Sequence, residues 1–105
     1  MQININKFNP TSPKILKDEQ QKLYDNYLQN AINVIERKIR LTEIRKTYNF
    51  SFGYIDSETS KLLDIQTATF DQQETLNHLA NIFQKGGWNT ELKYNPWSIT
   101  LSEKE

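Results

Sequence analysis

Residues 14–46 contain neither glycine nor proline, and this long uninterrupted stretch constrains the fold more than any other feature. Ser12 and Pro13 come just before it, and these residue types favour the N-cap and the first position of a helix. Apolar residues then recur at helical spacing, most regularly at Leu28, Ile32, Ile35 and Ile39. The sequence therefore predicts a long N-terminal helix.

The length of that helix creates a packing problem. At 1.5 Å per residue an unbroken helix over these residues would be about 50 Å long, whereas a small domain is about 30 Å across. The helix must therefore end near Leu41 and Thr42, or it must pack against a second copy of the chain. We predict a homo-oligomer, a dimer or a higher assembly, formed through the Leu28–Ile39 stripe.

The next segment, TYNFSFGYI, has an aromatic residue at every second position: Tyr48, Phe50, Phe52 and Tyr54. Alternation with a period of two is typical of a β-strand. Residues 56–60 (DSETS) have turn composition, and Leu63, Ile65 and Thr67 alternate again after it. These patterns predict a β-hairpin.

Helix signals return in residues 69–87. Asp71 with Glu74, or Thr69 with Gln72, makes a capping box, and Gly86-Gly87 supplies a C-terminal stop. The apolar stripe between them consists of Leu76, Leu79, Ala80 and Phe83. Alternating residues on both sides of Asn95-Pro96 then predict a second hairpin.

The order of these elements predicts an α+β fold. A long N-terminal helix is followed by hairpin, helix and hairpin, which form a mostly antiparallel sheet with helices on one face. We assign residues 1–12 to an N-terminal arm or edge strand. Residues 13–102 form a single α+β domain, and residues 103–105 form a charged tail.

Composition excludes several kinds of chemistry. Lys plus Arg equals Asp plus Glu at 13 each, so no net charge attracts polyanions. Cysteine is absent and His78 is the only histidine, which argues against thiolate sites, zinc sites and catalytic triads. We therefore expect no cofactor, no metal and no enzymatic activity. No apolar run suits a membrane span or a signal peptide, so the expected location is the host-cell cytoplasm.

Two groups of residues have both a structural and a functional interpretation. Phe50 and Phe52 either cover a sheet face beneath the helices or form a platform on which bases stack. The basic run in residues 36–46 is either a solvated helix end or a patch for phosphate and carboxylate groups. As candidate binding residues we select Arg37, Arg40, Arg45, Tyr54 and Trp97.

The C-terminal pattern LNHLANIFQKGGWNTELKYNPWSITLS adds a resemblance. Its helix ending in glycine and an aromatic residue, its strand, its short turn and its Ile-x-Leu strand resemble small uncharacterised bacteriophage proteins. The segments FQKGGWNTE and ITLSE are similar to the end of a phage-encoded anti-CRISPR inhibitor. The resemblance implies a phage or mobile-element accessory protein, although such inhibitors are usually acidic DNA mimics and this chain is neutral.

Three functional hypotheses follow. The first is a non-enzymatic accessory protein that binds and blocks or sequesters a host component, such as part of a defence system, with a host protein or a small nucleotide as its ligand. The alternative is a small single-stranded nucleic-acid-binding module that uses the aromatic strand residues and the basic helix end. A metal-dependent nuclease, the third, would use Asp64, Glu91 and Lys93.

Overall fold

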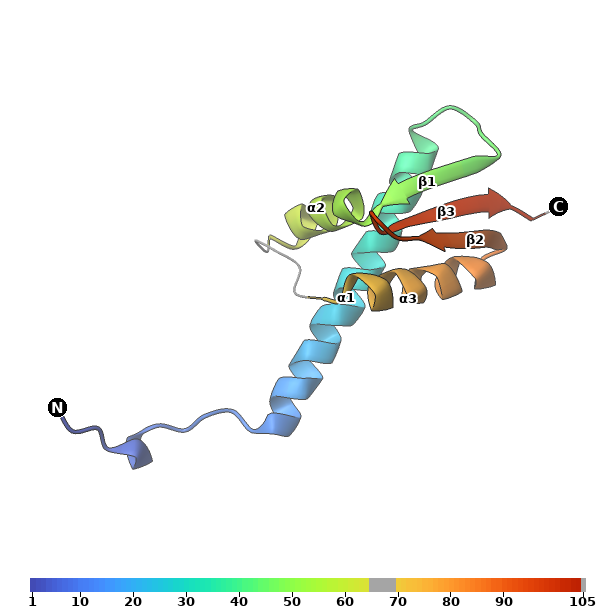
Figure 1. Cartoon of the computed structure of the whole chain (residues 1–105). Helices are drawn as coiled ribbons and strands as arrows, with labels where there is room; N and C mark the ends of the chain where they lie inside the picture. Colours follow the sequence, from blue (N-terminus) through green and yellow to red (C-terminus); the bar gives the residue numbers. More distant parts are fainter. Residues whose placement is uncertain (65–69, 105) are drawn as a thin grey trace.

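The computed structural model describes residues 1–64 and 70–104, and it has an α+β fold with a three-stranded antiparallel sheet (Figure 1). This confirms the predicted fold class. The elements in chain order are the 3₁₀ helix η1 (Ile5–Lys7), α1 (Pro13–Arg40), β1 (Thr47–Ser51), α2 (Phe52–Leu63), α3 (Gln72–Lys85), β2 (Trp88–Lys93) and β3 (Ser98–Glu103).

Side-chain hydrogen bonds mark both ends of helix α1. Ser12 is the N-cap, with its Oγ accepting a hydrogen bond from the backbone N of Ile15 at 3.4 Å, and Pro13 occupies the first turn. At the other end the Thr42 hydroxyl donates to the Lys38 carbonyl oxygen at 2.6 Å, and Leu41 is the C-cap. The helix therefore ends near Leu41, which was one of the two predicted alternatives.

Helix α1 nevertheless extends well beyond the rest of the molecule. The chain measures 66 × 25 × 23 Å, and Figure 1 shows the N-terminal half of α1 and residues 1–12 standing away from the sheet and the other helices. The radius of gyration of the whole chain is 18.0 Å. A compact domain of this length has a radius of gyration of about 13 Å. One end of the chain is thus outside the packed domain.

The Leu28–Ile39 stripe, which is the predicted oligomer seam, packs against the chain's own core. Ile35 is fully buried in the chain's own core, and the other three members of the stripe, Leu28, Ile32 and Ile39, pack against that core. These side chains cover the chain's own sheet and other helices, because α1 crosses behind the sheet and those helices (Figure 1). A homo-oligomer through this stripe stays a prediction, although the stripe already has a role within the chain.

The predicted first hairpin is also wrong. Strand β1 ends at Ser51, whose Oγ accepts a hydrogen bond from the backbone N of Tyr54 at 3.2 Å and so caps α2. Phe52, Ile55 and Thr59 are buried at helical spacing. The alternation of aromatic residues therefore continues from a strand into a helix. Of the predicted second strand, Leu63 lies in α2, while Ile65 and Thr67 lie outside the described residues.

The sheet has the order β1–β3–β2, with both pairs antiparallel, which confirms the predicted C-terminal hairpin. Ile99 of the central strand lies opposite Phe50 on one side and Leu92 on the other. Phe50, Ile99 and Leu101 are buried against the helices. On α3 the Asp71 carboxylate accepts from the backbone N of Glu74 at 2.8 Å, as the capping box predicts.

Candidate functional site

Two adjoining hollows lie where α1 ends, the chain turns and α2 begins. Their volumes are about 410 and 540 Å³, and Lys38 and Tyr54 line both. We call this surface the basic–aromatic groove and define it by Arg37, Lys38, Arg45, Tyr48 and Tyr54. It brings together side chains from α1, the α1–β1 loop, β1 and α2.

The centre of the groove is the contact between Lys38 and Tyr54. The Lys38 Nζ lies 5.8 Å from the centroid of the Tyr54 ring, within the range of a cation–π interaction. The same ring stacks on Phe50, with centroids 6.5 Å apart and planes inclined by 26°. Because Phe50 is buried in the core, this stack places the Tyr54 ring, and with it the Lys38 contact, against the packed domain.

The loop side of the groove is held by Tyr48. Its hydroxyl accepts a hydrogen bond from the backbone N of Arg45 at 3.0 Å, and its ring packs edge-on against Trp88 at 6.2 Å. The Arg45 guanidinium in turn pairs with Glu43 at 2.8 Å, although both side chains are exposed. Exposed pairs of this kind contribute little to stability, so the Arg45 side chain can exchange Glu43 for another carboxylate or a phosphate.

The electrostatics of the groove favour a ligand with few negative charges. The N-terminus of α2 opens onto the groove at Ser51 and Tyr54, and its helix dipole adds partial positive charge to the side-chain cations. Glutamates also lie among the cations: Glu43 beside Arg45, and Glu58 in the lining that includes Arg37. Alternating charges of this kind suit one or two anionic groups better than a long polyanion.

Three of the five predicted binding residues, Arg37, Arg45 and Tyr54, meet in the groove. Arg40 does not line it and pairs with Glu36 at 3.6 Å. Nor does Trp97, whose ring packs on Tyr94 and whose carbonyl oxygen accepts from the backbone N of Phe52 at 2.8 Å. Trp97 thus packs against the core, and its backbone holds the first residue of α2.

Lys38 and Tyr48 were not among the selected residues. The sequence does not indicate that Lys38 and Arg45 both lie near Tyr54. Their approach to Tyr54 depends on residues 52–63 forming a helix, whereas the sequence predicted a hairpin there. Tyr48 had one usable signal, its place at the outer end of the aromatic stripe directly after the basic run.

The base-stacking platform is not present in the expected form. Phe50 and Phe52 are only 5% and 6% exposed, which confirms the structural interpretation of these two residues. The face of the sheet opposite the helices carries polar side chains instead, and the Asn49 amide donates to the Thr100 hydroxyl across it at 2.7 Å.

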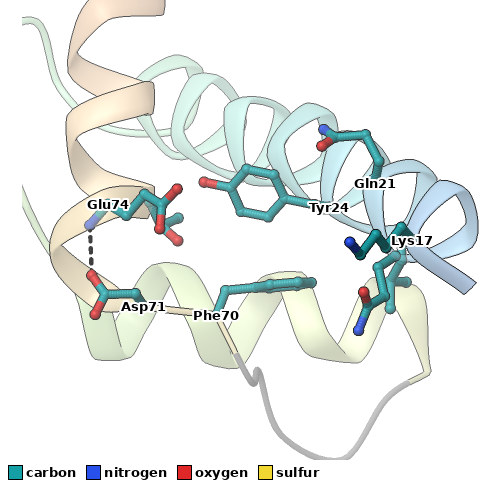
Figure 2. A pocket seen from close by; sticks show the side chains of 9 residues that line it. Lys17, Gln21, Tyr24, Phe70, Asp71 and Glu74 are labelled. Atoms are coloured by element: carbon teal, nitrogen blue, oxygen red, sulfur yellow. Dashed lines mark hydrogen bonds between the residues drawn. The ribbon is translucent and has the colours of Figure 1, made fainter. Parts of the chain in front are cut away.

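A separate hollow of about 560 Å³ lies between α1 and the start of α3 (Figure 2). Tyr24 from α1 and Phe70 meet edge to face, with centroids 4.9 Å apart, and the Tyr24 hydroxyl lies 2.5 Å from Nδ1 of His78. Burial, the main cause, raises the pKa of the Tyr24 phenol, so this group is a poor acid or base near neutral pH. The wall of the hollow is thus a set of packed rings from α1, Phe70 and α3.

Across the described residues, no three His, Cys, Asp or Glu side chains gather closely enough to hold a metal ion. Asp64 is the C-cap of α2, in the left-handed region, while Glu91 and Lys93 lie on β2. The nuclease hypothesis needs Asp64 at the end of α2 to lie beside Glu91 and Lys93 on β2, and it stays a prediction.

No family model, curated protein or solved structure matches this chain. Within residues 1–64 and 70–104, no helix is both long enough and apolar enough to cross a membrane. Function must therefore be argued from the groove itself.

Proposed function

We propose that this chain is a non-enzymatic binding protein whose basic–aromatic groove binds an acidic segment of a target protein. The observation that carries the proposal is the position of Lys38, whose ammonium group lies over Tyr54 where the two hollows meet. Arg37 and Arg45 line the hollows on its two sides. Tyrosine and arginine anchors around a central cation are the residue types that dominate binding energy at protein interfaces.

Two features favour an acidic protein segment over single-stranded nucleic acid. The Tyr54 ring already contacts Phe50 and Lys38, and Tyr48 already contacts Trp88, so these rings act as walls rather than as stacking surfaces. The chain has no net positive charge to attract a long phosphate backbone. A carboxylate-bearing loop needs only the local cations.

We further propose that binding blocks or sequesters the target. The prediction that this target is a host component, such as part of a defence system, rests on the resemblance to phage accessory proteins alone. The groove proposal does not depend on it.

Fluorescence anisotropy with two labelled probes tests the groove: a short peptide of alternating glutamate and leucine, and an oligothymidylate of equal charge. We expect the peptide to bind more tightly. Lys38→Gln should weaken it by about tenfold, the effect of losing one charge-assisted contact. Arg40→Gln is the matched control, because it removes the same charge from the same helix outside the groove.

Equal effects of the two substitutions would show that binding is a general charge effect and would refute the groove. Tighter binding of the oligothymidylate, falling steeply with added salt and lost in Lys38→Gln, would replace the acidic target with single-stranded nucleic acid.

A further inference from the structure

The hollow between α1 and the start of α3 has the size and composition of a small-molecule site (Figure 2). Its volume of about 560 Å³ lies within the range of roughly 300–1,000 Å³ that is typical of such sites. Leu23, Tyr24 and Phe70 give it aliphatic and aromatic walls. Charged and polar side chains line it as well, so it combines apolar walls with a few polar groups, as ligand sites do.

Two oppositely charged groups line this hollow without pairing with each other. Figure 2 shows the Tyr24 ring between the Glu74 carboxylate and the Lys17 ammonium group. Within residues 1–64 and 70–104, neither of these two charged side chains takes part in an ion pair. Asp71, the other carboxylate here, already accepts a hydrogen bond from the backbone N of Glu74 at 2.8 Å. Glu74 and Lys17 are therefore both available to a ligand.

A buried hydroxyl group in the lining also lacks a partner. Thr75 is fully buried, and its Oγ1 makes no hydrogen bond in the part of the chain that the structure describes. The Tyr24 hydroxyl is close to it but pairs with Nδ1 of His78. Buried hydroxyl groups are normally hydrogen-bonded, because an unpaired one loses its contacts with water and gains nothing in return. An ammonium group at the Glu74 end of the hollow would supply the missing donor.

We propose that this hollow binds a zwitterionic α-amino acid with an apolar side chain. Glu74 and Thr75 accept hydrogen bonds from its ammonium group, and Lys17 donates to its carboxylate. Tyr24 and Phe70 contact its side chain. A simple cation would leave Lys17 unpaired and a simple anion would leave Glu74 unpaired, whereas a ligand with both charges matches both ends. None of these residues lines the basic–aromatic groove, so the proposal is independent of the proposed function.

Three matched probes, titrated into the ¹⁵N-labelled full chain and followed by amide chemical shifts, test the ligand class. They are L-phenylalanine, phenethylamine, which lacks the carboxylate, and phenylpropionate, which lacks the ammonium group. We expect L-phenylalanine to bind with a dissociation constant below about 1 mM and to shift the amides of Tyr24 and Glu74. Each analogue should bind at least about tenfold more weakly, because one charge-assisted contact is lost. No binding of L-phenylalanine at about 10 mM, or an analogue that binds as tightly, would overturn the proposal.

Two substitutions test the position of the ligand's charges. Glu74→Gln and Lys17→Gln should each weaken L-phenylalanine by about tenfold. Glu19→Gln and Lys22→Gln are the matched controls, because they remove the same charges from α1 outside the hollow. Circular dichroism of each variant confirms that it is folded, and glutamine suits the third position of α3 as well as glutamate does. Effects no larger than those of the controls would show that L-phenylalanine does not bind in this hollow and would overturn the proposal.

Discussion

The most informative single substitution for the fold is Tyr27→Phe. Tyr27 is fully buried in α1, and its hydroxyl donates a hydrogen bond to Oδ1 of Asp56 in α2 at 2.5 Å. Hydrogen bonds to charged groups contribute about 1.5–3 kcal/mol. Because Asp56 is half-buried and water can replace part of the interaction, we expect the free energy of unfolding to fall by about 1–2 kcal/mol at neutral pH.

The same substitution should change how stability depends on pH. Burial, followed by the hydrogen bond to Asp56, raises the pKa of Tyr27 above its ordinary value of 10.0. The neutral phenol is therefore favoured in the folded state, and its contribution is complete below the unfolded pKa and declines as pH rises above it. Between about pH 10 and 11 the wild-type chain should lose about 1 kcal/mol through this group, whereas Tyr27→Phe should not.

Urea denaturation followed by circular dichroism, at neutral pH and at two alkaline values, measures both effects. Tyr24, whose pKa is also raised, is present in both proteins and cancels in the comparison. Tyr94→Phe is the control, because Tyr94 is 76% exposed and its loss should change neutral-pH stability by less than about 0.5 kcal/mol. Equal stability of wild type and Tyr27→Phe at neutral pH, or a gap that stays constant in alkali, would refute the reasoning.

Substitutions at three further positions test other elements by the same denaturation assay. Gly53→Ala should be more stable than Gly53→Val by about 0.3–0.5 kcal/mol, because a β-branched residue disfavours helix and a Cβ here meets no atom within 4 Å; the reverse order would indicate a strand. Asp71→Ala should cost about 1 kcal/mol by removing the cap of α3, and no loss would contradict that cap. Ile35→Ala should cost about 3 kcal/mol, and a cost below 1 would mean that the α1 stripe is not core.

The elements that could be predicted from sequence are those that have a clear capping residue or a clear alternation of apolar residues. Ser12-Pro13 begins α1, Asp71 caps α3, and the C-terminal hairpin has clear alternation. The prediction for the aromatic stretch was wrong because Phe52 fits two patterns: it alternates with Phe50 as in a strand, and it is spaced with Ile55 as in a helix. The deciding signal was Ser51, an N-cap residue placed inside the alternating run.

The groove could be predicted only in part. Arg37 and Arg45 were identifiable as members of a basic run around the end of the predicted helix, and both line the groove. The choice between Lys38 and Arg40 could not be made, because it depends on which face of α1 meets α2. That contact places Lys38 over Tyr54 and leaves Arg40 beside Glu36. The position of Trp97 could not be predicted either, because the hydrogen bond from the backbone N of Phe52 to its carbonyl oxygen is a tertiary contact without a local signal.

The most direct test of the proposed function is to locate the bound ligand on the molecule. A titration of ¹⁵N-labelled full-length chain with the acidic peptide, followed by amide chemical shifts, gives that location. We expect the largest shifts at Lys38, Arg45 and Tyr54, and their loss in Lys38→Gln. Shifts that instead cluster on the polar face of the sheet away from the groove, around Glu91 and Thr100, would contradict the basic–aromatic groove as the binding site.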